Sequence, residues 1–307
     1  MSNRDGTSRL RGALASGEFV VTAELGPPLN PDPELVRKTA RAFAGVVHAA
    51  NVTDNQAATV KLSPLACSVW MIEEGLEPIL QLTTRDRNVM ALQADLLGAW
   101  ALGVRSILTL SGDPLKVGPY ESIASRVGDI DGSGLARLVG EMNAGRLAAD
   151  EELATPTGFL VGGAANPLVD TVERVEQKLD AGVDFFQTNI VYDVDRFAEW
   201  FAPVTAAGLT GRAPVLVGVT PPRSTRMLRH MHDNIPGIEV DDATFSRMEG
   251  LEGDAAKTAG VEIAVEVVAR LRDVAGVTGV HLMAPGWEAE AVPQVVAGAG
   301  IRPASLV

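Results

Sequence analysis

The sequence predicts a single (β/α)8 barrel, in which eight parallel strands alternate with helices. Eight apolar runs of strand length recur along the chain, and the segments between them carry apolar residues at helical spacing. No G-x-G-x-x-G follows the first apolar run, so the fingerprint of a Rossmann dinucleotide-binding domain is absent. An open parallel sheet with fewer strands is the alternative fold.

The predicted strands are rich in aliphatic residues and end at small, polar or turn-forming residues. They comprise residues 19–25, 46–53, 77–84, 106–114, 158–165, 184–192, 214–220 and 277–284. The fourth run, S-I-L-T-L-S-G-D-P, is apolar until it approaches Asp113, as expected for a strand that is buried on both faces. Asp113 would then lie at the edge of the sheet where parallel α/β folds bind ligands.

Helical periodicity fills the intervals between these strands. The predicted helices comprise residues 32–45, 65–74, 89–102, 135–142, 169–181, 195–207, 224–234, 254–275 and 288–299. Glycine follows or ends several of them, for example Gly75, Gly103 and Gly182, which is typical of a helix C-terminus. An irregular acidic stretch is expected from 235 to 253. We expect one domain over residues 1–307, with a short polar N-terminal arm at 1–18.

A segment rich in glycine and proline, residues 115–134, follows the fourth strand and contains the one D-x-D-G-S-G run of the chain. Asp129 and Asp131 are typical of the start of a calcium loop, but the later ligand positions of a twelve-residue loop are absent. An extended active-site loop is therefore the favoured interpretation.

Composition excludes several classes of function. Lys and Arg number 26 against 39 Asp and Glu, and the resulting formal charge of −13 repels nucleic acid. The single cysteine, Cys67, excludes an internal disulfide and a cysteine-rich metal site. Because the sequence shows no secretory signal and no run of about 18 apolar residues, we expect a soluble cytoplasmic protein that does not bind membranes.

Polar residues gather at the predicted strand ends, which converge on one mouth in a barrel. They are Glu24, Thr53, Gln81, Thr84, Asp113, Asn166, Gln187 and Thr220. The set holds no histidine or lysine, which argues against a zinc hydrolase, a Ser-His-Asp hydrolase and a Schiff-base aldolase, and predicts no metal site. The remaining chemistry is proton donation by a buried carboxyl group, with a second carboxylate nearby and a bound cofactor for the difficult step.

Seven motifs carry a resemblance to a known family. They are A-E-L-G-P-P at 23–28, N-V-T-D at 51–54, L-Q-L-T-T-R-D-R-N at 80–88, L-S-G-D-P at 110–114, K-L-D-A-G-V at 178–183, F-F-Q-T-N-I-V-Y-D at 185–193 and G-V-E-I-A at 260–264. In this order, and at these strand ends, they resemble the methylenetetrahydrofolate reductase family from about Phe19 to the end of the chain.

The resemblance implies that a reduced flavin passes a hydride to 5,10-methylenetetrahydrofolate, giving 5-methyltetrahydrofolate, and that NAD(P)H re-reduces the flavin. Three positions match catalytic residues of the family. Glu24 matches the acid that protonates N10, Asp113 matches the aspartate beside the flavin and pterin, and Gln187 matches a glutamine that orients the substrate. The alternatives are a capping carboxylate for Glu24 and an interior amide for Gln187.

The resemblance also implies a set of cofactor-binding residues. They are Thr53, Gln81, Gly112, Asp113, Asp131, Asn166 and Lys178, of which Lys178 suits a phosphate. The familiar enteric-type members have a histidine at Gln81, an arginine at Ser111 and a tyrosine-containing segment where this chain has G-G-A-A-N-P. FAD, FMN and a flavin-free transfer directly from NAD(P)H therefore all stay open.

Partner proteins are a further open question. The G-G-A-A-N-P segment resembles the branch of the family that occurs with methyltransferase partners. An alternative hypothesis is thus a folate-binding subunit that depends on a methyltransferase or an electron-transfer partner. We also expect a homo-oligomer.

Overall fold

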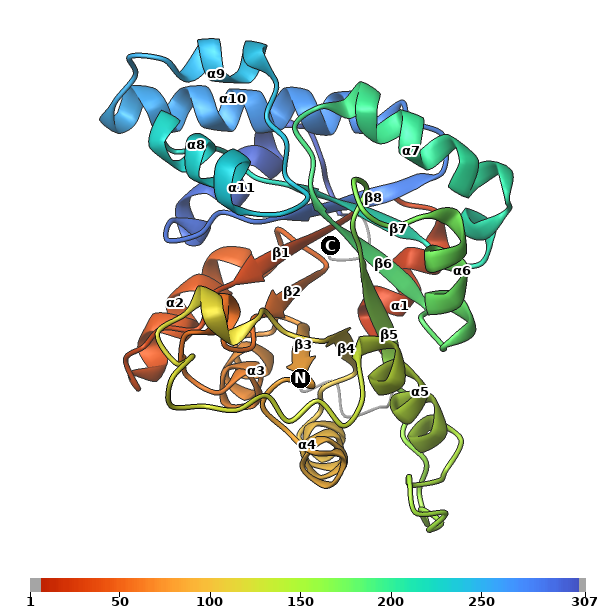
Figure 1. Cartoon of the computed structure of the whole chain (residues 1–307). Coiled ribbons are helices and arrows are strands. Elements are labelled where there is room, and N and C mark those ends of the chain that lie inside the picture. Colours follow the sequence, from red (N-terminus) through yellow and green to blue (C-terminus); the bar gives the residue numbers. More distant parts are fainter. Residues whose placement is uncertain (1–6, 304–307) are drawn as a thin grey trace.

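The computed structural model describes residues 7–303, and they form a closed barrel of eight parallel strands in sequence order (Figure 1). The strands are β1 (Val20–Leu25), β2 (Ala49–Val52), β3 (Pro78–Thr83), β4 (Ser106–Leu110), β5 (Leu160–Ala165), β6 (Phe185–Ile190), β7 (Val215–Val219) and β8 (Val277–Leu282). β1 pairs with both β2 and β8, which closes the sheet. The predicted barrel is confirmed, and the open sheet is wrong.

Helices cover the sides and the bottom of the barrel (Figure 1). They are α1 (Arg9–Ser16), α2 (Pro33–Phe43), α3 (Pro64–Glu73), α4 (Val89–Ala101), α5 (Gly132–Asn143), α6 (Val172–Asp180), α7 (Val194–Ala206), α8 (Thr225–Asn234), α9 (Asp242–Met248), α10 (Gly253–Arg272) and α11 (Glu288–Gly298). All nine predicted helices are present with boundaries shifted by a few residues. No helix of the described part of the chain is long and apolar enough to cross a membrane.

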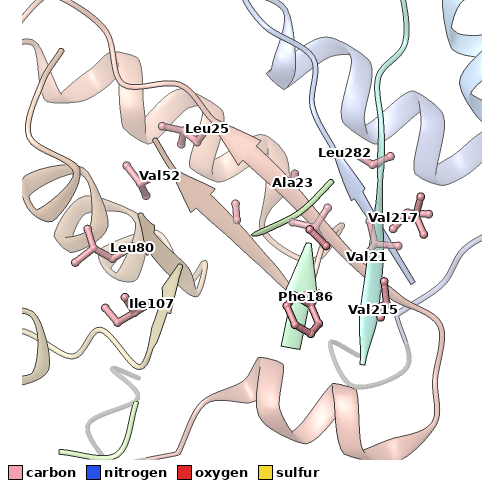
Figure 2. Close-up of a cluster of buried hydrophobic side chains, with 14 of the residues drawn as sticks. Val21, Ala23, Leu25, Val52, Leu80, Ile107, Phe186, Val215, Val217 and Leu282 are labelled. Carbon is pink, nitrogen blue, oxygen red and sulfur yellow. The ribbon is translucent and has the colours of Figure 1, made fainter. Parts of the chain in front are cut away.

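Side chains alternate between the two faces of each strand. Val21, Ala23 and Leu25 of β1 point outward and pack in the core between the strands and the helices (Figure 2). Val20 points inward and joins a second cluster inside the barrel, with Ala49, Ile79, Leu108, Leu160, Phe185 and Leu216. By the same alternation Thr22 and Glu24 face the interior, one and two layers above Val20.

Helix α1 closes the bottom of the barrel. The predicted arm is thus partly a helix, and its Leu10 and Ala13 are buried in the interior cluster of the barrel. The buried carboxylate of Glu77 holds α1 in place, since it accepts hydrogen bonds from Ser8 Oγ at 2.6 Å and from Arg9 N at 2.7 Å. This end of the barrel is therefore covered, and the polar strand ends lie at the opposite end.

The irregular stretch expected between 235 and 253 contains α9, which the sequence analysis missed. Asp241 caps this helix, since its side chain accepts a hydrogen bond from Thr244 N at 2.7 Å. Helices α8 and α9 follow β7 and pack on α10 through a separate apolar cluster that includes Leu228, Met248 and Ile263. The β7–α10 connection is therefore an ordered helical insertion at the rim of the mouth.

We expect Glu77→Ala to lower the free energy of unfolding by about 2 kcal/mol, because it leaves buried hydroxyl and backbone donors without an acceptor. Urea unfolding measures this change. Glu151→Ala is the matched control, because Glu151 is exposed and should shift stability by less than about 0.5 kcal/mol. Equal stability of the two variants would show that Glu77 does not anchor α1.

Candidate active site at the C-terminal mouth of the barrel

Glu24 is a buried carboxyl group near the end of β1, with an exposed fraction of 7%. Burial raises its pKa from 4.5 to about 7, and the negative charges of Glu288 and Asp113 act in the same direction. Hydrogen bonds with the side chains of Gln56 and Gln81 lower the pKa in part; Gln56 Nε2 lies 3.5 Å from Glu24 Oε1. Glu24 therefore both holds and releases a proton near neutral pH.

The alternative role of Glu24 as a capping residue is wrong. Helix α2, the first helix after β1, is capped by Asp32, whose side chain accepts a hydrogen bond from Glu34 N at 3.0 Å. The Glu24 side chain instead enters the barrel, in register with Asn51 on β2. The carboxyl group is thus free of any helix-capping role.

Asp113 follows β4 and connects two loops of the rim. Its Oδ2 accepts a hydrogen bond from Ala57 N at 2.7 Å, and its backbone oxygen accepts one from Arg85 Nη1 at 3.1 Å. The side chain is exposed, but its charge still contributes to the raised pKa of Glu24. The structure thus brings the two predicted carboxylates to the same mouth.

In the loop after β2, three residues have a backbone conformation that residues other than glycine rarely adopt. Asn55, Ala57 and Ala58 have φ angles of 47°, 54° and 48°, in the left-handed region that favours glycine. Asp113 holds Ala57 N, and Asn55 Oδ1 accepts a hydrogen bond from Lys61 N at 2.9 Å. This constrained loop carries Gln56 to Glu24, a pattern in which strain accompanies a functional site.

Charged residues of two motifs, N-V-T-D at 51–54 and L-Q-L-T-T-R-D-R-N at 80–88, form ion pairs at the rim of the mouth. Asp54 is buried and accepts hydrogen bonds from Thr83 N at 2.9 Å and from Arg87 Nη1 at 2.6 Å. The guanidinium group of Arg85 is paired with Asp86 at 2.7 Å. These residues hold the β2 and β3 ends together, so their charges are already compensated.

Gln187 lies inside the barrel, with an exposed fraction of 3%. Its amide exchanges two hydrogen bonds with the Asn51 amide, at 2.6 and 3.0 Å, and donates to Thr22 Oγ1 at 3.1 Å. His281 Nδ1 lies 3.3 Å from Gln187 Nε2, and burial lowers the pKa of His281 to about 3, so the ring is neutral. Gln187 thus has the position expected for an amide that is hydrogen-bonded within the barrel interior. Contact with a substrate would require its hydrogen bonds with Asn51 and Thr22 to break.

The predicted cofactor residues separate into two groups. Thr53 and Gly112 follow the ends of β2 and β4, and Gln81 lies within β3, where its side chain interacts with Glu24. Gly112 has φ +80°, and an added Cβ would lie 3.0 Å from Arg85 Cβ and 3.1 Å from Thr83 Cβ, so a side chain does not fit there. Glycine is therefore required at this position by the packing of Arg85 and Thr83 and by the left-handed backbone.

Asn166 and Lys178 form the second group, at the end of β5 and on the following helix α6. Asp131 lies instead beside the end of β4, where its neighbour Gly132 N donates to Ser111 Oγ at 3.0 Å. Lys178 Nζ donates to Asp170 Oδ2 at 2.6 Å and to Ala164 O at 2.8 Å, and Asn166 N donates to the same Asp170 oxygen at 2.9 Å. Asp131 caps α5 by accepting from Gly134 N at 2.7 Å. The charge of Lys178 is thus already compensated by Asp170, so a phosphate bound by Lys178 would have to share it with this carboxylate.

Two residues of the mouth were missed by sequence reasoning. Gln56 lies three positions beyond Thr53. The one sequence feature that could have indicated it is the polar dipeptide Asn55-Gln56 just after a predicted strand. Glu288 follows β8 at the start of α11, and its sequence neighbours are typical of any helix N-terminus. Among residues 7–303, no group of three His, Cys, Asp or Glu side chains is arranged to hold a metal ion.

The family model described as "Methylenetetrahydrofolate reductase" matches residues 9–300. The chain belongs to the methylenetetrahydrofolate reductase family. This match covers the whole barrel, including α1 and every strand that brings a residue to the mouth. The family resemblance predicted from the strand-end motifs is confirmed.

Two curated yeast members of the methylenetetrahydrofolate reductase family are similar to the chain. Methylenetetrahydrofolate reductase 1 of Schizosaccharomyces pombe is 25% identical over 260 residues, which are 80% of this chain and 39% of that protein. Methylenetetrahydrofolate reductase 2 of Saccharomyces cerevisiae is 27% identical over 226 residues, which are 68% of this chain and 34% of that protein. The chain thus spans little more than a third of the length of these relatives.

A solved structure shares the fold of this family member. It is an uncharacterized protein from Clostridium thermocellum, described as binding two copies of 5-methyl-5,6,7,8-tetrahydrofolic acid. The two structures superimpose with a TM-score of 0.65 over 94% of this chain and 97% of the other, at 15% sequence identity. The likeness shows the same barrel architecture.

The raised pKa of Glu24 predicts a pH-dependent stability. Because its folded-state pKa of about 7 exceeds the ordinary value of 4.5, the folded protein binds more protons between these values. The contribution of Glu24 to the free energy of unfolding therefore falls as the pH rises through this window. We expect Glu24→Gln to be more stable than the wild type at about pH 8, by roughly 3 kcal/mol at most, and to lose this advantage near pH 4.

Urea unfolding of both proteins at the two pH values measures the difference. A difference in stability that is the same at both pH values would mean that Glu24 titrates normally in the folded protein.

Proposed function

We propose that the chain is a 5,10-methylenetetrahydrofolate reductase, which produces 5-methyltetrahydrofolate by hydride transfer. The observation that carries this proposal is the buried Glu24 carboxyl group, whose pKa of about 7 suits a proton donor, at the mouth of a barrel of this family. The ligand described for the structurally similar Clostridium thermocellum protein is compatible with folate chemistry in this architecture.

The proposed role of Glu24 is to protonate N10 of the folate. The bond between N10 and the methylene carbon then breaks, its electron pair remains on N10, and the methylene carbon becomes part of a cationic iminium with N5. Glu24 is left as a carboxylate, and the nearby charge of Asp113 stabilises the cation. A hydride delivered to the methylene carbon completes the methyl group, so charge and atoms balance.

A flavin, when bound, would supply this hydride. Thr53, Gln81 and Gly112 would hold its ring side, and Lys178 would contact its phosphate. The pairing of Lys178 with Asp170 and the serine at position 111 support the second form of the proposal, in which NAD(P)H donates the hydride without a flavin. The assignment of Glu24 and Asp113 is the same in both forms.

We expect Glu24→Gln to reduce the turnover of methylenetetrahydrofolate by about 10²- to 10⁴-fold, since an amide cannot protonate N10. Oxidation of NAD(P)H in the presence of the folate measures the rate. Glu141→Gln is the matched control, because Glu141 is exposed on α5. Normal turnover by the Glu24 variant would exclude it as the acid, and absence of turnover by the wild type until a second protein is added would favour the partner-dependent folate-binding subunit.

The absorption spectrum of gently purified protein, with and without added FAD or FMN, distinguishes the two hydride sources. For the flavin-dependent form we expect one flavin per protein chain, either bound in the purified protein or bound after FAD or FMN is added. We expect Gly112→Val to abolish that uptake, because its side chain would collide with Thr83 and Arg85 and displace the backbone that follows β4. Full turnover of folate with no bound flavin would instead establish direct transfer from NAD(P)H.

A further inference from the structure

Glu288 connects the end of β8 to the end of β1. It is the first residue of α11, and the backbone N–H groups of Gly26, Gly286 and Glu288 itself act to lower the pKa of its carboxyl group. A Cβ added to Gly26 would lie 3.3 Å from Glu288 Oε1. A half-buried carboxylate is therefore held against the chain two residues beyond Glu24.

Burial has the largest effect on Glu288 and raises its pKa, and several interactions oppose this rise by favouring the charged form. Backbone N–H donors at a helix N-terminus stabilise a carboxylate, and the positive charge of Arg223 acts in the same direction. Arg223 comes from the β7–α8 connection, and a Cβ added to Gly286 would lie 3.2 Å from its Nη1. Burial raises the pKa of Glu288, and these interactions limit the rise.

We propose that Glu288 is a positioning residue that sets the proton affinity of Glu24, through a negative charge that the backbone of Gly26 and Gly286 holds beside it. The consequence for turnover rests on the proposed function, whereas the effect on proton affinity does not. No contact between Glu288 and the reacting atoms is required.

Among the other groups around Glu24, none places a negative charge with a larger effect on its pKa. From β4, Asp113 contributes a smaller effect on the pKa of Glu24, and from the β2 loop and β3 only the neutral Gln56 and Gln81 face it. Arg85 is paired with Asp86, and His281 in the barrel below is neutral. The next glutamate on α11, Glu290, is exposed and paired with Lys257 at 3.0 Å.

The test is a direct titration of Glu24 in the full chain. Protein labelled with ¹³C at the glutamate side-chain carboxyl is titrated by NMR, and the Glu24 resonance is assigned by its loss in Glu24→Gln. We expect Glu288→Gln to lower the apparent pKa of Glu24 by about half a unit or more, so that the protonated fraction at neutral pH falls from about a half to about a quarter. Glutamine keeps the size of the side chain and an oxygen that can lie against Gly26.

Two further variants separate charge from packing. Glu290→Gln removes a carboxylate from the same turn of α11 and should leave the Glu24 pKa at the wild-type value. Glu288→Asp keeps the charge and should hold the pKa above that of Glu288→Gln. An unchanged Glu24 pKa in Glu288→Gln overturns the proposal, as does an equal fall in the Gln and Asp variants.

Kinetics then connect the titration to the proposed function. The high-pH decline of kcat for methylenetetrahydrofolate should move to lower pH in Glu288→Gln by the same interval as the NMR titration, with KM little changed. If the wild type does not reduce this folate, the proposed function fails while the NMR titration still decides the role of Glu288. If the Glu24 pKa does not respond to Glu288→Gln, the inference fails even in a fully active enzyme.

Discussion

The burial of one carboxyl group inside a closed barrel is the constraint on which the mouth depends. In water Glu24 would be ionised at neutral pH, but removal of water and the charges of Glu288 and Asp113 keep a proton on it. Hydrogen bonds with Gln56 and Gln81 prevent the pKa from rising further. A donor that works near neutrality thus results from burial and two neighbouring charges, which outweigh the hydrogen bonds that oppose them.

This arrangement is unfavourable by itself, so the surrounding rim has to be firmly held. The loop that carries Gln56 has three non-glycine residues in left-handed conformations, and Asp113 fixes it through Ala57 N. The buried pair of Asp54 and Arg87 joins the loops after β2 and β3. At the opposite end Glu77 secures α1 across the bottom, and the interior stays closed to water from that side.

Inside the barrel, polarity changes layer by layer along the axis. The lowest layer is apolar, the middle layer contains the hydrogen-bonded group of Thr22, Asn51, Gln187 and His281, and Glu24 lies above it. The middle layer satisfies its own polar atoms, which avoids the cost of burying them unpaired.

The amino-acid sequence by itself determined the eight strands, nine of the helices and the convergence of Glu24 with Asp113. Strand and helix periodicities are local, and parallel strands of one barrel necessarily end at the same mouth. It did not predict α1 or α9, which are short. Helix α1 is positioned by Glu77, and α9 by packing on α10.

Only the tertiary structure decided which polar residues interact with one another. Gln187 is bonded to Asn51, which is 136 positions away in the chain, and Glu288 reaches Gly26 across the junction of β8 with β1. Lys178 is paired with Asp170, although its place in a matched motif had suggested a phosphate ligand. The pKa of Glu24 likewise depends on burial and on charges from distant segments, and no local pattern in the sequence records either of them.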